Sequence, residues 1–220
     1  MSAEISVDVW SDIACPWCYI GKRKFEAGLA AFAGADDVTV TYHSFELAPD
    51  TPVDFEGSEV DFLASHKGMD QAQVEQMLRQ VSTIASSVGL DYDFDSVKHT
   101  KTLLAHQALH FAKDHGKQLE LVERLFAAYF EEGRHVGRAA ELADLGADVG
   151  LDRDQLLAAL EAGSYADAVT ADLTQARAYG IQGVPFFVID GRYGISGAQQ
   201  PEAFTQALEQ VRTELAAARS

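Results

Sequence analysis

The sequence predicts an α/β fold in which an N-terminal β-α-β unit and a C-terminal β-β-α unit are separated by a large all-helical insertion. Apolar and polar residues alternate near both ends of the 220-residue chain, which is typical of half-buried strands. Helical spacing runs through the middle, from about residue 60 to residue 177. Because each end carries too few strands for an independent sheet, we expect residues 1–55 and 178–220 to form one domain and residues 56–177 to form a helical insertion domain.

The first unit covers residues 4–45. Ile5, Val7 and Val9 alternate with polar neighbours in the first predicted strand, residues 4–10, and residues 38–45 alternate again. Residues 15–32 between them have helical spacing. A parallel β-α-β crossover needs about 30 residues or more, and this segment is long enough.

The insertion and the last unit follow. Helices are predicted over residues 71–88, 101–115, 138–149, 153–162 and 166–179, with Asp152 as an N-cap. Two adjacent apolar rows indicate a core-facing helix, and they contain Leu121, Val122, Leu125, Phe126, Tyr129 and Phe130. The end of the chain predicts a strand over residues 184–189, a turn at Asp190-Gly191, a partner strand over residues 192–196 and a helix over residues 201–218.

Composition excludes several function classes. The chain has 17 Lys and Arg against 34 Asp and Glu, a net charge of −17, which argues against nucleic-acid binding and against docking on an anionic membrane. No apolar run approaches the ~20 residues that span a bilayer, and the start lacks the basic-then-apolar order of a secretory leader. We therefore expect a cytoplasmic protein. The acidity is uneven, since residues 46–97 hold 11 acidic and 2 basic residues.

The only two cysteines lie together in Cys15-Pro16-Trp17-Cys18, directly after the first strand and at the start of the first helix. Free N–H groups and the macrodipole at a helix N-terminus stabilise a thiolate. Cys15 is nearest that end and is predicted to be the low-pKa nucleophile, with Cys18 as the thiol that resolves a mixed disulfide. Pro16 suits the first turn of a helix, and Trp17 offers an apolar face to a partner.

A zinc half-site is the alternative for the cysteine pair. Structural zinc takes four ligands, and His106 and His110, at i and i+4 on a predicted helix, could supply the other two. We favour redox chemistry, and we expect these histidines and His43 to be ordinary partly buried residues. The basic cluster Lys22, Arg23 and Lys24 is expected to face solvent.

Gly-Val-Pro at residues 183–185 is a weak signal alone, because proline is common where a loop enters a strand. Together, CPWCYIGK (residues 15–22) and GVPFFVID (residues 183–190) resemble the thioredoxin superfamily. The chain is most similar to the DsbA-like oxidoreductases, which carry a helical insertion, and within them to the FrnE-like branch. Similar segments are HSFEL, AHQALHFAKDHG and LFAAYFEEGR, so the resemblance extends over nearly the whole chain.

The resemblance implies a thioredoxin-like fold with Cys15 and Cys18 as the redox pair. It implies that the Val184–Pro185 bond is cis, that this loop lies opposite Cys15, and that the backbone of Val184 pairs with the substrate. Substrate contacts are expected from Pro16 and Trp17 and from Val184 and Pro185. This chain departs from some relatives in having no cysteine after Cys18, and its Pro-Trp core leaves the redox potential open.

Three functions remain open at this stage. The first is a protein disulfide oxidoreductase or isomerase that acts on a thiol or disulfide, in a protein or a small molecule, without a metal or bound cofactor. The second is a glutathione-dependent small-molecule isomerase or transferase, since kappa-class glutathione transferases and 2-hydroxychromene-2-carboxylate isomerases are related. Glutathione is thus a candidate thiol co-substrate, and Trp17 and insertion aromatics could line a pocket against the cysteines. The third is a non-catalytic, redox-switched binding protein. Apolar surface on the insertion could also support a homodimer.

Overall fold

The computed structural model describes residues 4–218, so residues 1–3 and 219–220 of the predicted sheet domain lie outside the described residues. Strand β1 (Ile5–Ser11), helix α1 (Pro16–Ala30) and strand β2 (Val38–Ser44) form the expected β-α-β unit, with a short 3-10 turn (Ala35–Asp37) before β2. Strands β3 (Phe186–Ile189) and β4 (Tyr193–Ser196) and helix α9 (Pro201–Ala217) form the expected β-β-α unit. The α/β fold with a helical insertion is therefore confirmed.

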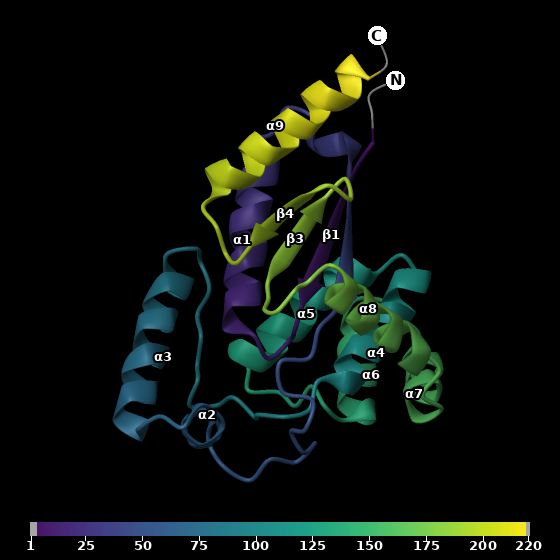
Figure 1. The fold of residues 1–220 in the computed structure, drawn as a ribbon. Helices are drawn as coiled ribbons and strands as arrows, with labels where there is room; N and C mark the ends of the chain where they lie inside the picture. The colour runs from purple at the N-terminus through teal and green to yellow at the C-terminus, as the bar shows by residue number, and fades with distance from the viewer. Residues whose placement is uncertain (1–3, 219–220) are drawn as a thin grey trace.

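The two units share one four-stranded sheet in the order β2-β1-β3-β4. Strand β1 is parallel to β2, with Ile5 opposite Val38, and antiparallel to β3, with Val7 opposite Ile189. Strand β3 is antiparallel to β4 across the turn at Asp190 and Gly191, which both have positive φ. Helix α9 packs along α1 and reaches β1 and β3, so these two helices cover the sheet together (Figure 1).

Seven helices of the described chain lie between β2 and β3: α2 (Glu59–Lys67), α3 (Gln71–Ser86), α4 (Leu103–Asp114), α5 (Gln118–Phe130), α6 (Ala139–Asp148), α7 (Arg153–Glu161) and α8 (Ala166–Ala178). Helices α5 and α8 contact β2, whereas α2 and α3 stand apart from the others and approach α1 near its N-terminus (Figure 1). Asp152 caps α7 by accepting a hydrogen bond from the Gln155 N–H, as predicted.

The core is continuous between the sheet and the insertion. The predicted apolar rows of α5 are buried throughout, and Phe126 and Phe130 join the same cluster as Val7 and Phe187. Within residues 4–218, none of the helices has the length and apolar character that crossing a membrane requires.

Candidate redox site

Cys15 lies at the junction of the sheet and helix α1. Its N–H donates to the Asp12 carbonyl at 3.1 Å, which closes the turn after β1, and its own backbone is extended, as an N-cap requires. The predicted helix start at Cys15 is thus one residue early, because Pro16 occupies the first turn. Cys15 is thus the N-cap residue of α1, and its side chain makes no capping hydrogen bond.

Cys18 follows one turn later, its N–H donating to the Cys15 carbonyl at 3.0 Å. Both cysteines are free thiols, with 3% and 2% of their surface exposed. Burial raises the pKa of Cys18 well above its ordinary value, and its hydrogen bond with Cys15 and the charge of that neighbour raise it further. The Cys18 thiol is therefore held in its protonated form at neutral pH.

The loop before β3 lies against the cysteines. The Cys15 Sγ is 3.6 Å from the Val184 carbonyl oxygen, and the Val184–Pro185 peptide is cis, which confirms what the resemblance implied. The strand predicted from residue 184 begins at Phe186 instead, because Pro185 has no N–H for the ladder. Gly21 lets α1 approach this loop: a Cβ at that position would lie 2.8 Å from the Pro185 Cγ.

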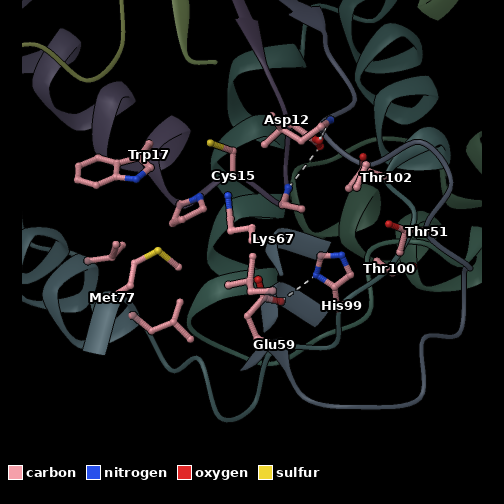
Figure 2. Close-up of a pocket in the computed structure, with 17 residues that line it drawn as sticks. Asp12, Cys15, Trp17, Thr51, Glu59, Lys67, Met77, His99, Thr100 and Thr102 are labelled. Carbon is pink, nitrogen blue, oxygen red and sulfur yellow. Dashed lines mark hydrogen bonds and ion pairs between the residues drawn. The ribbon is translucent and has the colours of Figure 1, made fainter. Parts of the chain in front are cut away.

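A cavity of about 170 Å³ opens on another side of Cys15, between the start of α1 and helices α2 and α3 (Figure 2). Trp17 lines it, as expected, and is 39% exposed. The expectation of insertion aromatics is wrong, because α3 contributes Met77, Leu78 and Val81 to the wall. The cavity therefore has one apolar side.

Its other side is polar. Glu59 and His99 form a buried pair with 2.8 Å between Oε2 and Nδ1, and the Phe62 ring stacks on the histidine. Thr51, Thr100 and Thr102 complete this side, together with Lys67 from the end of α2. Part of the acidic stretch thus reaches the redox site, although it is distant in sequence.

Asp12 connects this wall to the cysteine turn. Its Oδ2 accepts from the Leu47 N–H at 2.8 Å, and its Oδ1 lies 3.4 Å from Nε2 of the buried His106. Burial alone would raise the pKa of Asp12, but His106 and the Leu47 N–H lower it below its ordinary value. At 3.4 Å the histidine is within ion-pair distance without forming a well-aligned hydrogen bond, and neither of its ring nitrogens has one.

The basic cluster of α1 is placed differently from the prediction. The expectation that Lys22 faces solvent is wrong: it is 6% exposed, and its Nζ lies 2.6 Å from Glu123 of α5 and 2.5 Å from Glu26. Arg23 also pairs with Glu123, and Tyr19 donates to that carboxylate at 2.7 Å. These partners lower the pKa of Glu123 to about 2, against the effect of burial.

The three histidines considered in the sequence are buried or half-buried, and of these His106 approaches the cysteine turn through Asp12. His43 of β2 lies between two carboxylates, with Nδ1 2.8 Å from Asp172 and Nε2 2.8 Å from Asp8. His110 of α4 also approaches Asp172, at 2.9 Å. Among the side chains of residues 4–218, no group of three or more His, Cys, Asp and Glu is arranged to hold a metal ion.

Sequence reasoning missed the Glu59–His99 pair and Asp172. These residues lie in helices or loops whose polar residues look like ordinary surface residues. Glu59 is 40 residues from His99 in the sequence, and Asp172 is 129 residues from His43. No periodic pattern links residues so far apart.

Comparisons with known proteins agree with this geometry. The family model for DSBA-like thioredoxin domains matches residues 6–209. The uncharacterized protein YwbO of Bacillus subtilis (strain 168) is 30% identical over 206 residues, which are 93% of this chain and 96% of YwbO. A probable DsbA oxidoreductase from Streptomyces coelicolor is 40% identical, with a TM-score of 0.88 and coverage of 94% of this chain and 89% of its own. A 2-hydroxychromene-2-carboxylate isomerase, 13% identical with a TM-score of 0.69, shares the fold over 98% of this chain and 100% of its own.

Proposed function

The chain belongs to the DSBA-like thioredoxin domain family, and from this premise we propose that it is a thiol–disulfide oxidoreductase with Cys15 as nucleophile and Cys18 as resolving thiol. The observation that carries the proposal is the placement of Cys15. Cys15 is the N-cap residue of α1, its thiol contacts the Val184 carbonyl at 3.6 Å and it lines a cavity, whereas Cys18 lies one turn deeper.

The reaction follows from these positions. The Cys15 thiolate attacks one sulfur of a substrate disulfide, forms a mixed disulfide and releases the other sulfur as a thiolate. Cys18 then loses its proton and attacks the Cys15 sulfur, which forms the Cys15–Cys18 disulfide and releases the second substrate thiolate. Two electrons pass from the protein to the substrate. A thiol reductant restores the protein, and the same steps in reverse oxidise a dithiol substrate.

The raised pKa of Cys18 supports this order of events. A protonated Cys18 does not compete with Cys15 for the incoming disulfide. Once the mixed disulfide has formed, Cys15 can no longer carry a negative charge. One cause of the raised pKa of Cys18 is then removed, which favours ionisation of the Cys18 thiol. We infer that Val184 offers its backbone to the substrate and that Trp17, Pro16 and Pro185 frame the approach to Cys15.

The direction of turnover depends on the compartment. A cytoplasmic location fits the two cysteines, because both belong to the proposed reactive pair and neither forms a structural disulfide. In a reducing compartment the protein would act as a disulfide reductase or isomerase, and glutathione is the thiol co-substrate that we expect to restore the dithiol.

Insulin reduction and the reactivation of scrambled ribonuclease test the proposal. Cys15→Ser should abolish both activities, because it removes the attacking sulfur. Cys18→Ser should trap a mixed disulfide that mass spectrometry detects and that dithiothreitol releases. Full activity of Cys15→Ser in either assay would contradict the proposal.

The cavity beside Cys15 favours one second candidate, a glutathione-dependent isomerase of small molecules, a class with which the chain shares its fold. Such an enzyme would activate the thiol of glutathione and would not need its own sulfur. Isomerisation that depends on glutathione and survives Cys15→Ser would identify this function. Binding of a partner that follows the redox state, without turnover, would instead identify a redox-switched binding protein.

A further inference from the structure

The cavity at Cys15 is small, and it lies between the insertion and the segments around Cys15 and Leu47. Its volume is about 170 Å³, and an apolar cavity of about 150 Å³ holds one benzene molecule. The space therefore admits one ring or a short branched chain. The Cys15 surface is only 3% exposed, so a substrate that reaches the sulfur through this cavity has to enter with a slender part.

The apolar side of the cavity suits a ring or a short branched alkyl chain. Trp17 and Met77 lie on the same side of the cavity (Figure 2), and Leu78 of α3 and Leu63 of α2 also line it. A thioether and an indole ring both pack favourably against an aromatic or branched alkyl group.

The second observation is the positive charge of Lys67 at the cavity. Lys67 lines the cavity, and its amine is directed toward the end of α1 that carries Cys15 (Figure 2). Although the chain has a net charge of −17, no carboxylate among residues 4–218 lies within 4.0 Å of this amine. An unpaired cation that faces the apolar side of a cavity selects for a ligand with an anionic group.

Two polar groups on the polar side of the cavity, Thr51 and His99, have atoms without a hydrogen-bond partner among the described residues. The Thr51 hydroxyl is buried, with the residue 6% exposed, and has no hydrogen bond. His99 uses Nδ1 to contact Glu59, whereas its Nε2 makes no hydrogen bond within the described part of the chain. Buried polar groups of proteins are normally satisfied, so the Thr51 hydroxyl points to a polar atom of a ligand, and the His99 Nε2 is available to contact another.

We propose that this cavity is the substrate site of a reductase for small organic disulfides, with one ring or a short branched chain beside the sulfur and one anionic group held by Lys67. The proposal rests on the proposed function and names its substrate class. The Cys15 thiolate would attack the disulfide R–S–S–R to form Cys15–S–S–R and release R–S⁻. Cys18 would then lose its proton and release the second R–S⁻ by forming the Cys15–Cys18 disulfide, and two molecules of glutathione would restore both thiols and leave as glutathione disulfide.

Binding is tested without thiol chemistry. Benzoate and its neutral counterpart benzamide are titrated into the oxidised protein, and NMR chemical shifts give both dissociation constants. Lys67→Met should weaken benzoate about threefold to fivefold relative to benzamide, the size expected for a partly exposed ion pair, and Lys67→Arg should restore it. Lys113→Met is the matched control, because Lys113 also lies in the last turn of an exposed helix end and its loss changes the net charge equally.

The proposal is overturned if the two Lys→Met variants change the benzoate-to-benzamide ratio equally, or if the shifts do not map to Trp17 and Thr51. A cavity-filling variant, Ala48→Phe, gives a second measurement and should weaken both probes together. If Ala48→Phe leaves both affinities at their original values while the protein remains folded, the proposal also fails.

Turnover separates this proposal from the proposed function. Stopped-flow absorbance follows the reduced protein with the anionic dithiobis(nitrobenzoate) and the neutral dithiodipyridine. We expect both reactions to require Cys15, and Lys67→Met to lower the anionic rate relative to the neutral rate. If both reactions require Cys15 but Lys67→Met leaves the ratio of the anionic to the neutral rate unchanged, the cavity assignment fails and the proposed function stands. Probe binding that depends on Lys67, together with turnover that survives Cys15→Ser, supports the cavity and refutes the thiol mechanism.

Discussion

The His43 network gives a quantitative prediction for stability against pH. His43 of β2 lies between Asp8 of β1 and Asp172 of α8, and Asp172 also accepts from the Ser44 N–H at 2.7 Å and faces His110 of α4. Burial would lower the pKa of His43, but its hydrogen bonds to Asp172 and Asp8 and their charges raise it from 6.5 to about 9. The imidazolium is the form that the fold stabilises.

The size of the effect follows from this pKa. A group whose pKa rises from 6.5 to about 9 on folding contributes about 3 kcal/mol, and the His43 side chain is only 17% exposed. Because the folded pKa is the higher one, the contribution is complete below pH 6.5 and is lost as the pH rises through about 9. The free energy of unfolding should therefore fall by about 3 kcal/mol between these two pH values.

Urea unfolding at closely spaced pH values measures this decline. The background is Cys15→Ser with Cys18→Ser, which removes both thiols from the comparison. His43→Gln should be less stable by about 3 kcal/mol at pH 6 and should lose most of the decline toward pH 9.5. His66→Gln is the control, since His66 is exposed on α2 and has no carboxylate within 4.0 Å among the described residues. A decline that persists undiminished in His43→Gln would refute the reasoning.

Two further predictions concern α1. Gly21→Ala should slow exchange with any disulfide by about tenfold, because the added Cβ would lie 2.8 Å from Pro185 and displace the loop opposite Cys15, and small displacements near reacting atoms are costly. Gly183→Ala is the control, since its Cβ would face open space in the same loop and should leave the rate unchanged. Equal rates in the two variants would contradict this prediction. Glu123→Gln should lower the free energy of unfolding by about 1–2 kcal/mol, because it removes the negative charge next to the buried Lys22; this value is reduced for the 34% exposure of the Glu123 side chain. Chemical denaturation at pH 7 measures the change. An unchanged midpoint would show that Glu26 alone satisfies the lysine.

The sheet and the cysteine site could be predicted from sequence because their signals are local. Alternation along residues 5–11 and 38–44 needs only neighbouring residues to be visible, and the Cys15-Cys18 spacing places both thiols on one helical turn. The position of Pro185 opposite Cys15 is not local, and only resemblance to a family supplied it. Boundaries shifted by one or two residues where capping, rather than periodicity, decides them, as at Pro16 and Phe186.

The polar interior could not be predicted, because each pair depends on a distant partner. Lys22 belongs to a run of basic residues on a helix, and nothing near it in the sequence indicates that Glu123 neutralises it. Glu59 lies in the most acidic part of the chain, yet it is buried and pairs with His99 in the wall of the cavity. Such pairs are satisfied by tertiary contacts, and they leave no trace in hydrophobic periodicity.

The contacts between the insertion and α1 gather at the end of the helix that carries the thiols. Tyr92 donates to the Pro16 carbonyl at 2.7 Å, Phe126 stacks on Tyr19 with 4.9 Å between ring centroids, and Glu123 holds Lys22. All of these contacts lie within the first two turns of α1, next to Cys15 and Cys18. An insertion that only covered the sheet would not need polar contacts at this place. We infer that the insertion fixes the orientation of the redox helix with α5 and the segment at Tyr92, while α2 and α3 shape the cavity in front of it. Substitutions that loosen α5 from α1 should therefore slow the attack of Cys15 on large and small disulfides alike, whereas substitutions in α2 and α3 should change which disulfide is attacked.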